Sequence, residues 1–261
     1  MSTSDDTSTD PADASSGHTH TTHGAHERRG GTDAGGDADA ALVCAGLTKA
    51  YGDLVALAPL DLVINQGERV VLVGPNGSGK TTLLRMVAGL IEPSEGSCMV
   101  AGDPAGSINA RAALSYLPDD PVLYDDLSLA EHLRYIAGLH ETVDWAHRAN
   151  DLVERLGIAH RIDDLPARFS RGLRQKTSLA LGLVRPFDLL IIDEPFIGLD
   201  QPGKEALLEL LEEAADDGAT VIIATHQLEY VDKATRCIGL RDGTLSHDGE
   251  ASAQIVHELV S

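Results

Sequence analysis

Hydrophobic residues occur in short runs separated by glycine-rich or acidic turns from residue 41 onward. Residues 42–47 and 54–64 predict two strands with a turn between them. The apolar run at 70–73 predicts a short buried strand. The glycine-rich segment after it leads to apolar residues at 83, 84, 87 and 90, a spacing typical of a helix. The chain therefore passes directly from a strand through a glycine-rich loop into a helix.

The hydrophobic pattern changes between about residues 106 and 185, where we predict helices and few strands. Ser128 and Glu131 have the spacing of a capping box, which indicates a helix N-terminus. Ser170 suits the N-cap of a later helix, and Pro186 would end that helix. We interpret this stretch as a helical insertion in an α/β core.

Two largely apolar runs then return, at 189–192 and 220–224, with a predicted helix at about 202–217 between them. Such runs are typical of parallel strands covered on both faces. The pair Asp242-Gly243 favours a tight hairpin turn. A short amphipathic helix is predicted within 248–261, so the folded domain spans about 41–247.

The glycine-rich loop reads Gly74-Pro75-Asn76-Gly77-Ser78-Gly79-Lys80-Thr81-Thr82. Between a strand and a helix, this pattern indicates a phosphate site, because backbone N–H groups and the helix N-terminus can face phosphate oxygens. Gly77 and Gly79 leave room for that close approach. Lys80 can reach the β- and γ-phosphates, and the Thr81 hydroxyl can bind Mg²⁺. An ordinary glycine-rich turn is the alternative, which the complete motif disfavours.

Polar residues follow the predicted parallel strands at their carboxyl ends, where ligands collect in open sheets. Asp193 can hold Mg²⁺, and Glu194 can accept a proton from an attacking water. His226 follows the next strand. If these strands are neighbours of the strand before Gly74, all three groups converge on one phosphate. Two acids that simply close a strand remain the alternative for the Asp193-Glu194 pair.

The formal net charge of −21 disfavours binding to nucleic acid, which normally requires a basic surface. Five lysines stand against fifteen arginines, and Asp is abundant. Adaptation to a salt-rich cytoplasm and a genomic preference for Arg codons explain this composition equally well. Cys44, Cys98 and Cys237 are widely spaced and lack a CxxC pair, so we expect neither a disulfide framework nor a metal site. A hydrophobic content of 43% over 261 residues suffices for one core with a sub-domain.

Residues 1–40 contain eight acidic residues, two arginines and almost no large apolar side chains, so we predict a disordered tail. His18, His20, His23 and His26 form a loose cluster, for which a solvated tail is a better interpretation than a metal site. The sequence has no apolar run of about 18 residues and no basic-then-apolar signal pattern. Any membrane role must therefore come through a partner.

Taken together, these motifs resemble the ATP-binding subunits of ABC transporters over roughly 41–247. The Walker A loop stands as GPNGSGKTT, the strand before the catalytic base as LLIIDEP, and the signature as FSRGLRQK at 169–176. Ile197-Gly198-Leu199-Asp200 matches the D-loop, and Ala224-Thr225-His226 the switch histidine. Tyr51 matches the aromatic residue that stacks on adenine; without the resemblance it would be a packed strand-end aromatic.

The resemblance implies a P-loop NTPase core with a mostly parallel sheet, an antiparallel β lobe and the helical insertion. It also implies that two such subunits, alike or unlike, sandwich ATP and Mg²⁺. Ser170 and Gly172 would then face the γ-phosphate bound by the opposite subunit. His226 would sense the γ-phosphate, and Asp200 would couple the two sites. The nucleotide-binding residues implied in this way are Tyr51, Gly74, Asn76, Gly77, Ser78, Gly79, Lys80, Thr81 and Thr82.

The chain departs from the family pattern at two places. Arg171 and Leu173 replace a Gly and the Gln of the usual LSGGQ signature. Asp119 stands where the family carries the lid glutamine, in the hinge that links nucleotide state to the membrane partner. Asp119 can still bind Mg²⁺ or orient water, but it adds negative charge near the phosphates.

The resemblance implies an ATPase that energises transport, with a membrane permease as its partner and the cytoplasmic face of the membrane as its location. The YLPD and FSxGxRQK patterns are similar to those of single-domain ATPases of the export branch. The alternative is a soluble ABC-type ATPase that acts on a scaffold, such as one for iron-sulfur cluster assembly. A nucleic-acid machine is disfavoured, because the chain is acidic and has no long coiled-coil insertion.

Overall fold

The computed structural model describes residues 39–225 and 227–260. Most of the predicted tail and all of its His cluster lie outside the described residues, as does His226. The first strand begins at Ala40, one residue before the predicted start of the domain. The last strand continues to Gly249, two residues beyond the predicted domain end at 247.

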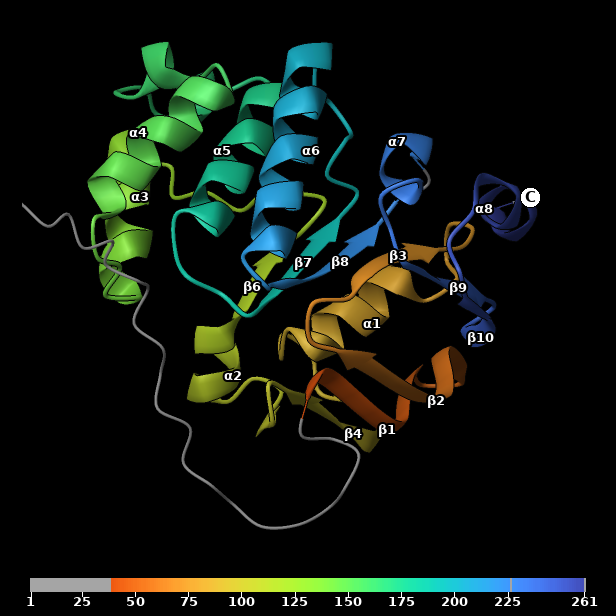
Figure 1. The fold of residues 1–261 in the computed structure, drawn as a ribbon. Coiled ribbons are helices and arrows are strands. Elements are labelled where there is room, and N and C mark those ends of the chain that lie inside the picture. The colour runs from red at the N-terminus through yellow and green to blue at the C-terminus, as the bar shows by residue number, and fades with distance from the viewer. Residues whose placement is uncertain (1–38, 226, 261) are drawn as a thin grey trace, which may run out of the picture. The chain divides into compact units, whose positions relative to one another are not determined.

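One sheet is a small antiparallel lobe with the strand order β2-β1-β4-β5 (Figure 1). Its strands are β1 (Ala40–Tyr51), β2 (Leu54–Asn65), β4 (Glu95–Val100) and β5 (Asp103–Pro104). The strands predicted at 42–47 and 54–64 are therefore confirmed and are longer than predicted. Cys44 lies directly opposite Cys98 in this lobe, with 3.7 Å between the two Sγ atoms, and both thiols are free.

The second sheet has six strands in the order β10-β9-β3-β8-β7-β6. The strands are β3 (Arg69–Val73), β6 (Leu114–Leu117), β7 (Leu189–Asp193), β8 (Thr220–Ala224), β9 (Arg236–Arg241) and β10 (Thr244–Gly249). All neighbours are parallel except β9 and β10. Every residue of β7 and β8 is buried, as their continuous apolar sequences predict. The strands β3 and β8 are neighbours, and β7 lies on the other side of β8.

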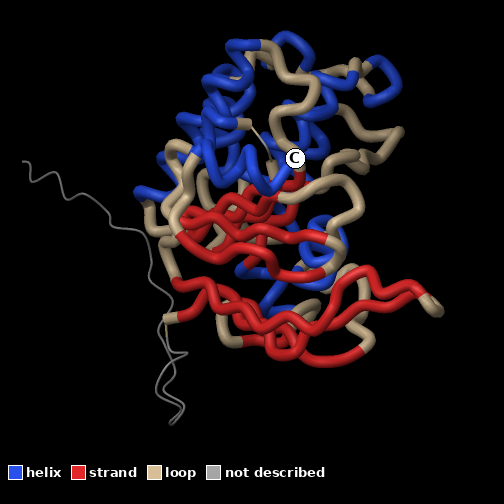
Figure 2. Tube along the Cα trace, turned by 90° about the vertical axis from the view of Figure 1, so that its right-hand side faces the viewer, coloured by secondary structure: helices blue, strands red, loops and turns tan. Residues whose placement is uncertain are grey.

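Alternate residues of β3 face different cores, because successive side chains of a strand point to opposite faces. Val71 and Val73 belong to the core under the helices, whereas Val70 and Leu72 face the antiparallel lobe and α1 (Lys80–Val87). Figure 2 shows the resulting layers: most helices gather above the parallel sheet, and the antiparallel lobe lies below it, with α1 packed on the side of the lobe.

The helical layer consists of α3 to α6. Their bounds are α3 (Leu129–Leu139), α4 (Trp145–Arg155), α5 (Arg171–Leu183) and α6 (Gln201–Asp216). The short 3-10 turns η1 (Ala159–Arg161) and η2 (Pro166–Arg168) connect α4 to α5. The predicted capping box is present: Glu131 N donates to Ser128 Oγ, and the Glu131 carboxylate accepts from Ser128 N at 2.8 Å. Ser170 is the N-cap of α5.

The structure corrects two details of the predicted elements. The range 106–185 contains not only α2 (Ile108–Ala113) but also the edge strand β6, which pairs with β7 in the core sheet. The helical layer therefore starts after β6. In addition, α1 ends at Val87, because Gly89 adopts a φ of +66°, and Leu90 lies outside the helix. The side chain of Leu90 is 63% exposed.

The chain closes with α7 (Leu228–Val231), the β9–β10 hairpin and α8 (Ala253–Val260). Asp242 and Gly243 have φ values of +49° and +75°, as the predicted tight hairpin turn requires. Among the described residues, no helix is both long and apolar enough to cross a membrane.

Candidate functional site

The glycine-rich loop lies between the end of β3 and the start of α1, as predicted. Gly79 has a φ of +101°, and a Cβ atom there would lie 2.7 Å from the Ala56 carbonyl oxygen. Only glycine fits this position, because the loop contacts β2 directly. At Gly77 a Cβ would meet no protein atom within 4 Å, and its φ of +83° also favours glycine. Its predicted role, to leave room for a phosphate, stays a prediction.

The β9–β10 hairpin turn supports the phosphate loop from outside the motif. Gly243 N donates to the Ser78 carbonyl at 3.1 Å, and the Gly243 carbonyl accepts from Ala58 N at 2.8 Å. The turn therefore links the loop to β2. Sequence reasoning missed this contact, since it joins segments more than 160 residues apart and no local pattern indicates it.

Lys80 folds back over the loop. Its Nζ donates to the carbonyl of Gly74 at 2.7 Å and to that of Pro75 at 3.2 Å. Burial lowers the pKa of Lys80, and the carboxylates of Glu194 and Asp193 oppose that shift. The ammonium group is thus held beside the loop by carbonyls and nearby negative charge. This is the position from which it can meet a phosphate.

Thr81 and Asp193 come together although 112 residues separate them: Thr81 Oγ1 donates to Asp193 Oδ2 at 2.7 Å. Burial raises the pKa of Asp193, the Thr81 hydrogen bond opposes this shift, and the charge of Asp119 adds to it. A hydroxyl and a carboxylate side by side are oxygen ligands of the kind that Mg²⁺ prefers. The residues present therefore fit the metal that the sequence predicts.

Glu194 has a φ of +48°, which is uncommon for a residue other than glycine. Its backbone N donates to the Ala224 carbonyl at 2.8 Å and so ties the end of β7 to the end of β8. Strained backbone of this kind costs roughly 1–3 kcal/mol and persists where surrounding contacts enforce it, often at functional sites. The conformation thus marks the residue predicted as the catalytic base.

These groups surround one pocket with a volume of about 380 Å³. It is lined by the predicted residues Tyr51, Asn76, Gly77, Ser78, Gly79, Lys80, Thr81, Thr82, Asp119, Asp193 and Glu194, and by Leu54 and Ala56, which were not predicted. Ser78 Oγ is buried and has no hydrogen-bond partner among the described residues. Buried polar atoms are normally satisfied, so this atom is consistent with a phosphate ligand.

Tyr51 lines this pocket, and about half of the residue is exposed. Lys49 Nζ lies 5.1 Å from the centroid of its ring. An exposed aromatic ring beside a phosphate loop can stack on a base. This geometry fits the adenine contact better than the packed strand-end aromatic that we considered as the alternative.

Four of the described residues predicted for the site are absent from the lining of this pocket. One is Gly74, which meets the site through its carbonyl, the acceptor for Lys80 Nζ. Ser170 caps α5, and its Oγ accepts from Leu173 N at 3.2 Å. A Cβ at Gly172 would lie 2.5 Å from the Gly198 carbonyl oxygen, so the start of α5 packs on the D-loop. Asp200 caps α6 and accepts a hydrogen bond from Lys176 Nζ at 2.7 Å. A role at the opposite subunit's nucleotide stays a prediction for these last three residues, as does the role of His226.

Comparison with known proteins identifies the family. Residues 57–197 match the family model described as "ABC transporter". The chain belongs to the ABC transporter family. This ABC ATPase is 37% identical over 205 residues to the SkfA peptide export ATP-binding protein SkfE of Bacillus subtilis (strain 168), covering 77% of this chain and 86% of SkfE.

Two further relatives agree with this assignment. The probable multidrug ABC transporter ATP-binding protein YbhF of Escherichia coli (strain K12) is 35% identical over 221 residues; the match covers 82% of this chain but only 38% of YbhF. A solved ATP-binding subunit of an ABC transporter superposes with a TM-score of 0.76 at 32% identity, over 80% of this chain and 89% of that one. The protein is therefore an ATP-binding ATPase of this family, with the predicted P-loop α/β fold.

Proposed function

We propose that this ABC ATPase binds Mg²⁺ and ATP in the pocket around Lys80 and drives export through a separate membrane permease. The observation that carries the proposal is the convergence of Lys80 and Thr81 with Asp193 and Glu194, from two distant segments of the chain, on one pocket. Export is favoured because SkfE is named for peptide export and YbhF for multidrug transport. These names favour transport over the alternative role in iron-sulfur cluster assembly.

In this proposal each side chain has one task. Lys80 binds the β- and γ-phosphates, and Thr81 and Asp193 hold the metal, which neutralises phosphate charge when bound. Glu194 accepts a proton from the attacking water. Tyr51 stacks on the base. A second subunit, alike or unlike, adds Ser170 and Gly172 to the γ-phosphate, with His226 and Asp200 coupling the sites.

Glu194→Gln tests the catalytic assignment. The amide keeps the size and hydrogen bonding of the side chain but cannot take the proton, so we expect ATP binding to persist while turnover falls by orders of magnitude. Steady-state phosphate release and fluorescent-nucleotide binding separate the two effects. Lys80→Ala is the comparison variant, which should weaken both. Wild-type turnover in Glu194→Gln would remove Glu194 from the role of base.

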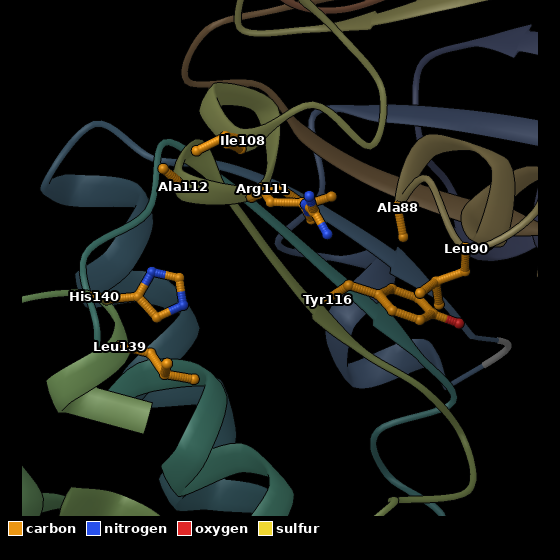
Figure 3. A pocket seen from close by; sticks show the side chains of 9 residues that line it. Ala88, Leu90, Ile108, Arg111, Ala112, Tyr116, Leu139 and His140 are labelled. Atoms are coloured by element: carbon orange, nitrogen blue, oxygen red, sulfur yellow. The ribbon is translucent and has the colours of Figure 1, made fainter. Parts of the chain in front are cut away.

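The permease is proposed to dock in an apolar groove of about 560 Å³ beside the edge strand β6, lined by the segment after α1, by α2 and by the end of α3 (Figure 3). Three exposed apolar residues line it: Leu90 after α1, Ile108 in α2 and Leu139 at the end of α3, which are 63%, 79% and 61% exposed. An exposed apolar surface of this kind indicates a protein partner. Because Tyr116 also lines the groove, three residues before Asp119, the groove adjoins the nucleotide pocket along the chain.

We further propose that the protein lies at the cytoplasmic face of the membrane, held there by its permease. Ile108→Glu should abolish co-purification with the membrane fraction while ATPase activity in solution persists, because the groove is outside the nucleotide pocket. Val143→Glu is a matched control, since Val143 is 85% exposed and lies outside the groove. Equal membrane association of both variants would show that the permease docks elsewhere.

A further inference from the structure

The carboxylate of Asp119 lies between the nucleotide pocket and the start of α5. It lines the nucleotide pocket together with Asp193 and Glu194. Its Oδ1 also lies 3.7 Å from Nη2 of Arg171, the first residue of α5. Both residues are departures from the family pattern, and only the fold brings them together. The ion pair thus joins the wall of the phosphate pocket to the start of the signature helix.

Arg171 packs through its aliphatic part, and its guanidinium is exposed to solvent. Ser170 caps the helix beside it, and the aliphatic part of the Arg171 side chain covers Gly198, where a Cβ would lie 3.4 Å from Arg171 Cγ. The side chain is nevertheless 68% exposed, and that of Asp119 is 49% exposed. An exposed ion pair of this kind is weak, so either partner can leave it for a stronger ligand.

The charges that line the pocket determine how the Asp119–Arg171 ion pair affects nucleotide binding. Three carboxylates, those of Asp119, Asp193 and Glu194, line the pocket with one ammonium group, that of Lys80. A nucleotide adds further negative charge. Without a metal, an uncompensated Asp119 would repel the phosphates; with a metal, the same carboxylate would attract the cation. Arg171 opposes both effects, because it neutralises Asp119 in the first case and competes with the cation in the second.

We propose that Arg171 is a positioning residue for Asp119, and that their ion pair reduces the dependence of nucleotide binding on Mg²⁺. With Mg²⁺ and nucleotide bound, Asp119 would turn from Arg171 toward the cation, and the guanidinium at the start of the signature helix would lose its partner. This inference rests on the proposed nucleotide site. It adds that Arg171, which does not line the pocket, modulates nucleotide binding there through Asp119.

The test compares nucleotide affinity with and without Mg²⁺ in the full-length chain. The Kd of a non-hydrolysable ATP analogue is measured in Mg²⁺ and in EDTA, at protein concentrations at which light scattering finds a monomer. The readout is the ratio of the EDTA value to the Mg²⁺ value. In Arg171→Gln this ratio should rise roughly two- to fivefold, the range expected for an exposed ion pair. Arg171→Lys should restore most of the wild-type ratio.

Two controls separate the effect of the Asp119–Arg171 ion pair from a general effect of removing a positive charge. Arg168→Gln removes the same charge from a similarly exposed arginine, whose 3.7 Å ion pair is with Asp164, and should leave the ratio unchanged. In an Asp119→Asn background, Arg171→Gln should have no further effect, since its partner is gone.

The outcomes are distinguishable. An unchanged ratio in Arg171→Gln, or an equal rise in the Asp119→Asn background, would overturn the role of the ion pair while leaving the nucleotide site intact. A wild-type chain that binds the analogue in neither condition would refute the nucleotide site itself, and this inference with it.

Discussion

Arg185 supports the segment from α2 to β6 that lines the groove. Its replacement is the sharpest structural test of what stabilises the groove. The residue follows α5, and only 6% of it is exposed. Its Nη1 donates to the Leu114 carbonyl at 2.7 Å, and its Nη2 donates to the carbonyls of Ala112 at 2.6 Å and Arg111 at 3.2 Å. These carbonyls belong to the end of α2 and the start of β6. Burial lowers the pKa of Arg185 to about 10, so the guanidinium is still charged at neutral pH.

Arg185→Met keeps the aliphatic volume but removes all three hydrogen bonds. A hydrogen bond to a charged group contributes about 1.5–3 kcal/mol, and the three bonds share one group, so their losses do not add fully. Relief of the buried charge offsets part of the loss. We expect the free energy of unfolding to fall by about 2–4 kcal/mol, which corresponds to a fall in Tm of roughly 5–15 °C for a domain of this size.

Urea unfolding followed by circular dichroism measures the effect. Arg241→Met is the matched control, because Arg241 also donates to two carbonyls, of Glu258 and Leu259, but is exposed. That control should lose no more than about 0.5 kcal/mol. A second readout is His140, which lines the groove and whose pKa is lowered by burial and by the charge of Arg185. In Arg185→Met the pKa of His140, followed by NMR, should rise.

A loss of stability in Arg185→Met no greater than in Arg241→Met would refute this reasoning, since it would mean that the buried carbonyls find other partners at no cost. An unchanged pKa of His140 in a folded Arg185→Met protein would show that the guanidinium does not act on the groove electrostatically.

Two further predictions concern assembly and acid stability. Mg²⁺ and ATP should convert the Glu194→Gln variant into a dimer, measured by size-exclusion chromatography with light scattering. Adding Ser170→Arg should abolish the dimer but leave nucleotide binding by the monomer intact. A dimer that survives Ser170→Arg would contradict the shared site. Arg236 donates to both carboxylate oxygens of Asp248, at 2.7 and 2.8 Å, and so lowers the pKa of Asp248. The stability from this pair is therefore present above the ordinary pKa of Asp and lost as the pH falls through the lowered value. Asp248→Asn should cost about 1 kcal/mol at neutral pH and little in strong acid, and a cost in urea unfolding that does not change with pH would contradict the ion pair.

Much of the fold could be predicted because its signals are local. The apolar runs that form β7 and β8 predict buried parallel strands, and the Ser128–Glu131 spacing predicts a helix start. Both follow from interactions within a few residues of each other. The edge strand β6 was missed for the same reason. Its four residues carry little periodic signal, and its strand conformation depends on pairing with β7, more than 70 residues away.

In the candidate site, too, the local features could be predicted from the sequence and the long-range contacts could not. The phosphate loop and the Asp193-Glu194 pair are contiguous motifs, so their chemistry is readable from residue type and order alone. The support of the loop by Gly243, the pairing of Asp119 with Arg171 and the approach of Cys44 to Cys98 are contacts between distant segments. No local pattern specifies such contacts.

The sequence by itself therefore determined the elements, the phosphate-binding chemistry and the family resemblance of this ATPase, because backbone preferences and motif chemistry act over short stretches of chain. The tertiary structure alone decided that β8 lies between β3 and β7, so that Asp193 meets Thr81, and that Leu90 and Ile108 line a groove rather than a core. These outcomes depend on strand order and packing. Many segments could satisfy the same local pattern, and only their joint burial selects which of them become neighbours.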